Sequence, residues 1–309
     1  MSAVKFSVVI PAYNAEPTIK ASVASVLAQT DQDFEIVIVD DGSSDGTLNA
    51  MLDLAVMDWR IRIVSHPNSG VSATRNYGAS LAKGELIAFL DADDQWHPEK
   101  LARHRAMHDY DPLLTASFAK VEFCSERKGR LEAGRSQSSV PADYLDLGDV
   151  LFENAVCTTS NLVIERAAFR DARGFNEAMR YAEDQEFLAR LIADGGLVRG
   201  IQHPLVRYRM SEDGLSCDFE AMLDNWRGFA SCWIEGPGLA QAEATYCRYL
   251  ARRALRAGVP IRVARSFARR GIDADRETFM SGGARSLLTL GGVVAGGAIP
   301  ASVRRAVFA

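Results

Sequence analysis

The stretch Ala88-Phe-Leu-Asp-Ala-Asp-Asp94 ends an apolar run that begins at Leu86 and indicates a buried strand. The run stops at three carboxylates within four residues. Because burying unpaired carboxylates is costly, we expect them just past the end of the strand. In an open α/β sheet ligands bind at that edge, and Asp-x-Asp there suits a hard divalent cation. The alternative is a solvated acidic turn before the helix expected after Pro98.

The N-terminal half alternates between apolar runs and segments with one apolar helical face. The expected strands cover 7–10, 34–39, 61–64 and 86–90. One of the expected helices covers 71–82 and carries Arg75, and Gly84 follows it as a stop. The alternation predicts a doubly wound, mainly parallel α/β sheet. Asp40 and Asp41 follow the second strand, so two acidic loops are expected at one sheet edge.

Composition excludes several classes of protein. The 309 residues carry a formal net charge of −5, which argues against a nucleic-acid binder. Five cysteines without a C-x-x-C pair predict free thiols in a reducing cytosol, and no apolar leader precedes the first strand. We therefore expect a cytoplasmic protein. Glycine patterns of the G-x-G-x-x-G and Walker types are missing, which disfavours dinucleotide oxidoreductases and P-loop enzymes.

The sequence from 218 onward is helical in pattern, so we expect a catalytic domain over 1–217 and a helical region over 218–309. Arginines are dense between 248 and 276. One interpretation is a solvated basic face, and a second is peripheral contact with anionic lipid on the inner face of the cytoplasmic membrane. The uncharged segment 286–303 contains four glycines and a proline, which favours a packed hairpin or interfacial segment over a membrane-spanning helix.

An ordered set of motifs over about residues 5 to 216 resembles the family-2 glycosyltransferases of the GT-A fold. The matching stretches are Ser7-Val-Val-Ile-Pro-Ala-Tyr-Asn14, Ser25-Val-Leu-Ala-Gln-Thr30, Phe34-Glu-Ile-Val-Ile-Val-Asp-Asp-Gly-Ser-Ser-Asp-Gly-Thr47, Gly70-Val-Ser-Ala-Thr-Arg-Asn76, Gly84-Glu-Leu-Ile-Ala-Phe-Leu-Asp-Ala-Asp-Asp94, Thr159-Ser-Asn161, Gly174-Phe-Asn-Glu177 and Ala182-Glu-Asp-Gln-Glu-Phe-Leu188. Each motif is weak by itself, whereas the order and spacing of the set are specific.

The resemblance implies a nucleotide-diphospho-sugar donor, with UDP-sugars favoured, a Mn²⁺ or Mg²⁺ cofactor, and a glycan or lipid-linked hydroxyl acceptor in polysaccharide, lipopolysaccharide or glycolipid synthesis. Its implied donor-binding residues are Pro11, Tyr13, Asp40, Asp41, Arg75, Asp91, Ala92 and Asp93. By the same resemblance Pro11 and Tyr13 would line the base pocket, Asp41 with Asp40 beside it would accept a hydrogen bond from a uracil-type ring, and Arg75 would contact the base or the phosphates. Asp93 and Asp91 would bind the metal, which stabilises the leaving diphosphate. Asp184, expected at the start of an amphipathic helix, matches the general base of an inverting displacement, and a simple helix cap is the alternative. The roles of Asp94 and Glu183 stay open.

One motif departs from the family. Many members carry a histidine shortly after a Tyr-Arg pair, whereas here Tyr208-Arg209 is followed by Met210 and Ser211. Arg209, Ser211 or Ser216 would have to replace that histidine near the diphosphate, or the site works differently. His104 and His108 have a spacing that can bind zinc, but a solvated or core-edge helix face is the favoured interpretation. Two other functions stay open, a sugar nucleotidyltransferase and a non-catalytic sugar-nucleotide-binding protein. Sugar, linkage and oligomeric state are not predicted.

Overall fold

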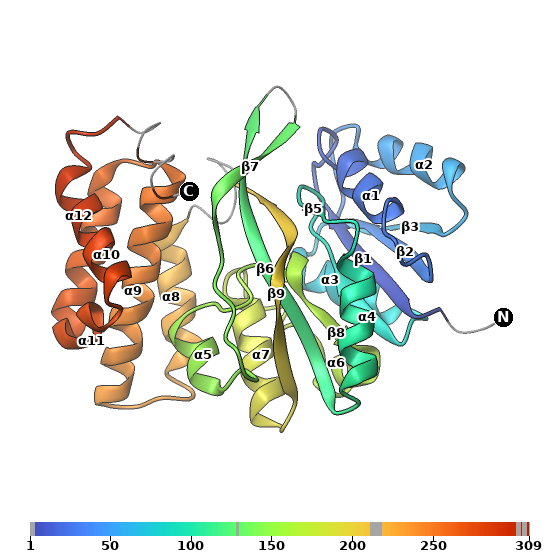
Figure 1. Ribbon diagram of the computed structural model, residues 1–309. Helices are drawn as coiled ribbons and strands as arrows, with labels where there is room; N and C mark the ends of the chain where they lie inside the picture. The colour runs from blue at the N-terminus through green and yellow to red at the C-terminus, as the bar shows by residue number, and fades with distance from the viewer. Residues whose placement is uncertain (1–3, 128–129, 211–217, 301–303, 305–307, 309) are drawn as a thin grey trace. The chain divides into compact units, whose positions relative to one another are not determined.

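The computed structural model describes residues 4–127, 130–210, 218–300, 304 and 308, and it divides the chain into two compact units (Figure 1). The α/β unit comprises 1–122, 137–147 and 155–209. The helical unit comprises 123–136, 148–154 and 210–309. The helical unit thus includes two segments that precede residue 210 in the chain.

Nine strands form one sheet in the described part of the chain, in the order β3-β2-β1-β4-β8-β6-β9-β5, with β7 paired to β6. Their bounds are β1 Phe6–Ala12, β2 Phe34–Asp40, β3 Ile61–Ser65, β4 Leu86–Phe89, β5 Gln95–Trp96, β6 Leu114–Arg127, β7 Arg130–Gln137, β8 Val163–Glu165 and β9 Leu197–Arg209. The four predicted strands are β1 to β4, each within two residues of the expected bounds. The predicted α/β fold is confirmed.

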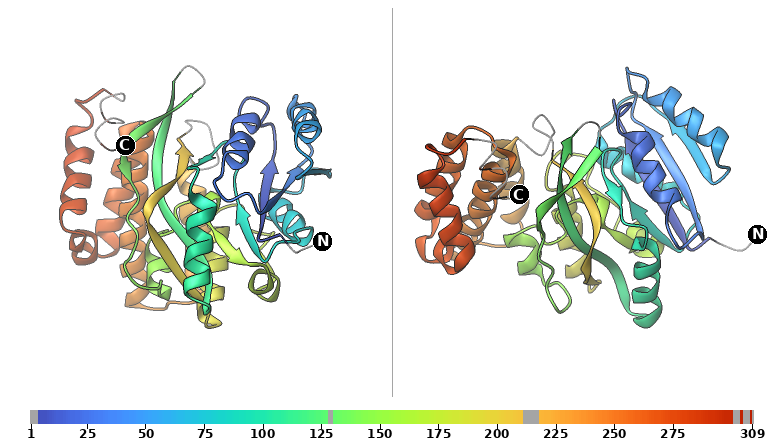
Figure 2. Two further views of the ribbon diagram at one scale, coloured as in Figure 1. Left: turned by 45° about the vertical axis from the view of Figure 1, so that its right-hand side comes forward. Right: turned by 45° about the horizontal axis from the view of Figure 1, so that its top comes forward.

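The first four strands are parallel, and their order fixes where the helices lie. The chain steps outward from β1 to β2 and β3 through α1 (Ile19–Leu27) and α2 (Thr47–Met57). It then returns across the sheet to β4 through α3 (Val71–Ser80). Because such crossovers are right-handed, the reversal puts α3 on the opposite face from α1 and α2 (Figures 1 and 2). Gly78 of α3 permits this packing, since a Cβ there would lie 2.5 Å from Val9 Cγ1.

Beyond β4 the sheet continues with antiparallel pairs, β4 with β8, β8 with β6 and β5 with β9. This extension was not predicted, since its strands are short or alternate in polarity. β1 also runs past Pro11, where the sequence predicted its end. Proline is tolerated there because β4 pairs only with residues 6–9 of β1, so no bond to β4 is lost at Pro11.

The remaining helices of the α/β unit surround the antiparallel half. They are α4 Lys100–Tyr110, the short turn η1 Thr159–Asn161, α6 Arg166–Asp171 and α7 Glu183–Ala193. Four phenylalanines, Phe89, Phe169, Phe175 and Phe187, join β4, α6 and α7, with ring centroids 5.1–5.3 Å apart. This aromatic cluster fixes the start of α7 relative to the end of β4, where the acidic residues lie.

In the part of the chain that the structure describes, the helical unit has five named helices from the C-terminal third and α5 (Leu147–Phe152) from the middle of the chain. The five are α8 Phe219–Ala230, α9 Pro237–Ala257, α10 Ile261–Ala274, α11 Arg276–Ser281 and α12 Ala284–Ala295. Trp226 stacks on Tyr246 at 4.6 Å and donates its indole N–H to Leu151 O. Among the residues described, no helix is long and apolar enough to cross a membrane. Part of the predicted 286–303 segment, residues 301–303, lies outside the described residues.

Candidate active site

The loops after β1 and β2 are bound to each other. Asn14 has a left-handed backbone with φ 47°, which asparagine tolerates. Its side-chain oxygen accepts the Ser44 N–H at 2.9 Å, and its own N–H donates to Ser43 Oγ at 3.0 Å. Of the predicted base-binding residues here, Pro11 is buried at the end of β1 and Tyr13 is 55% exposed. The exposed ring leaves a phenol face available for stacking.

Asp40 and Asp41, the predicted uracil-recognition pair, are both buried. Asp40 accepts hydrogen bonds from the Ser43 N–H at 3.2 Å and the Ser65 hydroxyl at 2.9 Å. Asp41 accepts from the Ser69 and Gly70 N–H groups at 2.7 and 3.1 Å. Asp41 therefore organises the loop that leads into α3. A carboxylate has further lone pairs, so a hydrogen bond to a base remains compatible with these contacts.

The loop 91–94 lies directly beyond β4, as predicted. Backbone contacts hold it, because the Asp91 N–H donates to Ser160 Oγ at 2.9 Å and Arg209 Nε donates to Asp93 O at 2.9 Å. Burial and the neighbouring Asp91 raise the pKa of Asp93 to about 6. Asp94 Oδ1 accepts the Arg209 N–H at 2.8 Å, while Asp94 Oδ2 is buried with no hydrogen-bond partner in the described part of the chain. The loop thus gathers three carboxylates in a partly buried position.

Arg75 joins this loop to the start of α7. Its Nη2 contacts Asp91 Oδ1 at 2.6 Å and its Nη1 contacts Glu183 Oε1 at 2.8 Å, and the side chain is only 5% exposed. Burial opposes the charge, but the two carboxylates outweigh it and hold the pKa of Arg75 above its usual value. The guanidinium also lies 5.7 Å from the Phe175 ring centroid. The predicted role of Arg75 toward base or phosphate is untested, and its contacts here are to two carboxylates.

One face of α3 also holds the segment that precedes α7. Asn76 donates to Phe175 O and Glu177 Oε1, both at 2.9 Å, and accepts the Phe175 N–H at 2.9 Å. Ser72 donates to Met179 O at 3.3 Å. Ser72, Arg75 and Asn76 share a helix face because they are spaced by three or four residues. The Gly70–Asn76 motif therefore connects the sheet edge to α7.

Asp184 is the second residue of α7, and the residue before the helix, Ala182, has a left-handed backbone with φ 59°. Ala182 rather than Asp184 occupies the cap position, so the alternative that Asp184 is a simple helix cap does not fit this helix start. Asp184 is largely buried and accepts the Gln185 N–H at 2.9 Å. Burial raises the pKa of Glu183, an effect that Arg75 partly offsets and Asp184 reinforces.

Several supporting residues were missed by the sequence prediction. Ser160 contacts Asp91 from η1, and Trp96 donates its indole N–H to Ser160 O at 2.9 Å. Lys100 is fully buried and donates to Asn161 O at 3.1 Å. The Thr159–Asn161 motif matched the family, but its support of the acidic loop follows only from the three-dimensional contacts.

His104 and His108 are buried rather than solvated, and the zinc interpretation finds no support in their contacts. His104 Nδ1 and His108 Nε2 lie 2.7 and 2.9 Å from the same Ser117 hydroxyl. Lys100 Nζ lies 3.0 Å from His104 Nε2. Burial lowers the pKa of His104 well below its usual value and that of His108 to about 4. The two rings are therefore neutral members of a buried polar chain.

Of the residues predicted to replace the family histidine, Arg209 lies against Asp93 and Asp94 through the contacts above. Ser211 and Ser216 lie outside the described residues. Arg209 is thus placed beside the acidic loop by the β5–β9 pairing, in which Gln95 faces Arg207.

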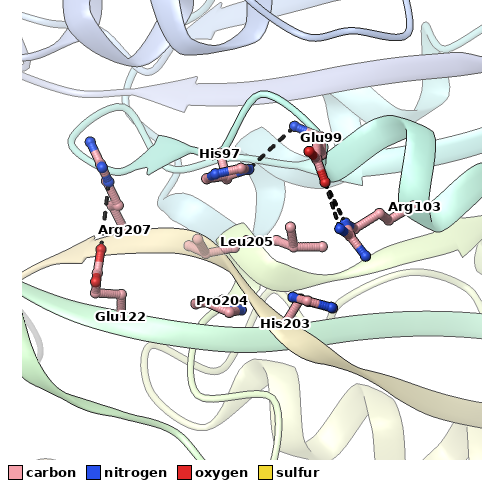
Figure 3. A pocket seen from close by; sticks show the side chains of 9 residues that line it. His97, Glu99, Arg103, Glu122, His203, Pro204, Leu205 and Arg207 are labelled. Atoms are coloured by element: carbon pink, nitrogen blue, oxygen red, sulfur yellow. Dashed lines mark hydrogen bonds and ion pairs between the residues drawn. The ribbon is translucent and has the colours of Figure 1, made fainter.

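A separate pocket of about 200 Å³ lies further along β9 (Figure 3). Glu99 pairs with Arg103 at 2.6 Å at one end, and Glu122 pairs with Arg207 at 3.5 Å at the other. His97, His203 and Leu205 lie between them. Since each arginine has a glutamate partner, the pocket has no excess of fixed charge, and we assign it no role.

The acidic loop after β4 is the candidate metal site. Within the described residues no three His, Cys, Asp or Glu side chains are grouped to hold a metal ion by themselves. Mg²⁺ commonly takes only one or two carboxylates and fills its shell with water and substrate phosphates. The orphaned Asp94 Oδ2 and the clustered charges of Asp91 and Asp93 fit such an ion. The side chains thus suit a metal that binds together with a diphosphate.

Comparison with known proteins identifies the family of this chain. The family model described as Glycosyl transferase family 2 matches residues 7–189. The chain is 28% identical over 256 residues to the putative teichuronic acid biosynthesis glycosyltransferase TuaG of Bacillus subtilis, covering 78% of this chain and 92% of TuaG. It is 29% identical to the uncharacterized glycosyltransferase EpsJ of Bacillus subtilis over 68% of this chain, and the match spans 62% of EpsJ, less than two thirds of that relative.

Solved structures share the fold. The S. aureus TarS 1–349 structure in complex with UDP-GlcNAc has a TM-score of 0.61 at 21% identity and covers 90% of this chain and 91% of its own. The mannosyltransferase PcManGT from Pyrobaculum calidifontis, in complex with GDP-Man and Mn²⁺, has a TM-score of 0.59 at 17% identity and covers 96% and 81%. With the family match over more than half of its length, the chain belongs to glycosyl transferase family 2.

Proposed function

We propose that this glycosyltransferase moves a sugar from a nucleotide-diphospho-sugar to an acceptor hydroxyl with inversion at the anomeric carbon. The observation that carries the proposal is the Arg75 bridge, since it connects the acidic loop after β4 to the helix that begins with Glu183 and Asp184. A leaving-group site and a base are the two parts that such a displacement needs.

In the proposed step the acceptor oxygen attacks the anomeric carbon from the face opposite the diphosphate. The acceptor O–H proton passes to the Asp184 carboxylate as the new C–O bond forms. The bond between the anomeric carbon and the diphosphate oxygen breaks, and its electron pair leaves with the nucleoside diphosphate. Arg75 fixes Asp91 relative to α7, so it positions both partners of the reaction.

The divalent cation belongs to this proposal. When bound, Mg²⁺ or Mn²⁺ supplies positive charge that neutralises the leaving diphosphate. Asp93 would hold it, with Asp91 in support. Asp91 Oδ1 is already engaged by Arg75, so Asp93 is the principal candidate. Support also comes from the PcManGT structure, which contains Mn²⁺.

Donor and acceptor classes are proposed from relatives. WfgD of Escherichia coli, named a UDP-Glc:α-D-GlcNAc-diphosphoundecaprenol β-1,3-glucosyltransferase, is 41% identical over 102 residues, which is 33% of this chain and 40% of WfgD. The name of WfgD and the UDP-GlcNAc bound to TarS both favour a UDP-sugar as the donor. We infer an acceptor glycan for the cell envelope, either free or linked to lipid. A cytoplasmic location and a catalytic domain bounded at residue 217 remain predictions.

Product analysis tests the proposal. Purified protein is incubated with Mn²⁺ or Mg²⁺ and a panel of UDP-, TDP- and GDP-sugars together with envelope glycan acceptors. The expected products are a glycoside with inverted anomeric configuration and one equivalent of nucleoside diphosphate. Pyrophosphate release from sugar phosphate and nucleoside triphosphate would instead identify a sugar nucleotidyltransferase. Tight donor binding without product would identify a binding protein.

A further inference from the structure

The outer face of α12 is apolar, which is the reverse of the pattern expected for a surface helix. Leu287, Leu288 and Val294 are 64, 60 and 75% exposed, while Ser286 and Thr289 are fully buried. Ser286 donates to Phe279 O at 2.6 Å, and Thr289 donates to Arg285 O at 2.7 Å. Because water favours polar side chains outside, this arrangement indicates that something apolar covers the outer face of α12.

A row of arginines on α10 lies beside this apolar face. Arg262, Arg265 and Arg269 recur at helical spacing and are exposed. Arg265 Nε donates to Val293 O at 3.0 Å, so α10 runs next to the last turns of α12 (Figures 1 and 2). A groove of about 440 Å³ lies between the two helices, lined by Arg265, Ala268, Arg269, Ile272, Leu290, Val293 and Val294. Apolar and cationic groups thus form one continuous surface.

The charge of the helical region favours an anionic partner. Residues 218–309 contain 13 arginines, no lysine and eight acidic residues, so they carry a net charge of +5 in a chain whose total is −5. Within the row Arg269 has an acidic neighbour, Asp273, whose carboxylate lies 3.5 Å from Arg269 Nε. A second copy of this chain would bring the same arginines to the contact and be repelled by them. An anionic lipid surface offers both phosphate groups and an apolar interior.

We propose that the α10–α12 face binds the surface of a membrane that contains anionic phospholipid. Leu287, Leu288 and Val294 enter the boundary between headgroups and acyl chains, and Arg262 and Arg269 contact lipid phosphates. This binding rests on the surface alone and does not require the proposed glycosyl transfer. It would bring the enzyme to the membrane that carries a lipid-linked acceptor.

A rival apolar surface exists on α2 of the α/β unit. Leu48, Leu52 and Val56 follow helical spacing there, and Val56 and Trp59 are 89 and 90% exposed. Its charged neighbours include Asp53, which pairs with Lys20 at 3.0 Å. The α2 surface has no row of exposed arginines, so it lacks attraction for anionic lipid. It therefore supplies a matched control for exposed apolar area.

Vesicle co-sedimentation of the full chain, without nucleotide sugar, tests the proposal. We expect binding to phosphatidylcholine vesicles that contain phosphatidylglycerol, and weak binding to phosphatidylcholine alone or at high salt. Each arginine near an anionic surface is worth roughly a fivefold change in partitioning, so Arg262→Gln/Arg269→Gln should lose about 25-fold. Leu287→Ser/Leu288→Ser should lose at least about tenfold, because the lost leucine burial is worth more than about 1.4 kcal/mol.

The control variant Val56→Ser/Trp59→Ser should bind like the wild type, and circular dichroism melting checks that every variant folds. Absence of binding to phosphatidylglycerol vesicles at low salt would overturn the proposal. The proposal would also be overturned if Val56→Ser/Trp59→Ser lost vesicle binding while Leu287→Ser/Leu288→Ser kept it. Conversion of a wild-type dimer to a monomer by Leu287→Ser/Leu288→Ser, without vesicle binding, would instead identify a second copy as the partner.

Discussion

Replacing Arg75 by methionine should destabilise the α/β unit more than almost any other single charge removal. The guanidinium is buried and bridges Asp91 and Glu183 at 2.6 and 2.8 Å. Arg75→Met keeps much of the apolar stem and leaves two partly buried carboxylates, 24 and 13% exposed, without their cation. Breaking a buried ion pair from one side costs about 3–5 kcal/mol. In a domain of this size that loss lowers Tm by about 6–20 °C.

Thermal and urea denaturation followed by circular dichroism measure this effect. Arg170→Met is the matched control, because Arg170 is 72% exposed and, among the described residues, pairs with its neighbour Asp171 alone. That substitution should change stability by less than about 0.5 kcal/mol, as surface pairs do. Arg75→Lys should lie between the two variants, since one ammonium does not reproduce the two-pronged contact.

A compensating variant separates the charge effect from loss of packing. In Arg75→Met/Asp91→Asn/Glu183→Gln the carboxylates that would be left unpaired are neutral amides. If burial of unpaired charge is the cause, the triple variant should regain a large part of the stability that Arg75→Met loses. A melting temperature of Arg75→Met within about 1 °C of the wild type would refute this reasoning, as would strictly additive losses in the triple variant.

Three further outcomes follow from the site and from the buried histidines. Asp184→Asn should leave donor affinity, measured by calorimetry, nearly unchanged while turnover falls by about 10²–10⁴-fold, and near-wild-type turnover would remove Asp184 from the role of base. Asp93→Ala should lose activity and donor affinity together, and activity that survives both this change and EDTA would contradict the metal assignment. His108 has a pKa near 4 in the folded protein against 6.5 when unfolded, so its contribution to stability is present above pH 6.5 and is lost as the pH falls toward 4. His108→Gln should therefore reduce the loss of urea stability between pH 7 and pH 4, and an unchanged pH slope would contradict the buried neutral ring.

The parallel half of the sheet was predictable because its signals are local. Each strand of that half is a short apolar run that ends in a loop of polar or acidic residues, and β4 with Asp91 is the clearest case. The position of Asp184 at the start of a helix was also predicted correctly. These features depend on neighbouring residues, so periodicity and turn composition are enough to locate them.

The contacts between distant segments were not predictable. Arg75 meets Glu183 across 108 residues because the chain reverses direction in the sheet between β3 and β4. Similarly, helical spacing placed His104 and His108 on one face but gave no sign of Ser117 on β6, which contacts both rings. The exposed leucines of α12 were also hidden, since an uncharged segment does not reveal which side faces outward.

The three carboxylates after β4 differ in what already holds them, and this difference ranks them as metal ligands. Asp91 is engaged by Arg75, and Asp94 accepts the Arg209 N–H from β9. Arg209 Nε donates to the backbone carbonyl of Asp93. In the described part of the chain no side chain donates a hydrogen bond to the Asp93 carboxylate. The backbone of Asp93 is thus fixed, while its carboxylate is available to bind a metal ion. Fixed backbone and uncommitted charge are what a cation site requires, so Asp93 is the residue whose loss should affect metal binding most.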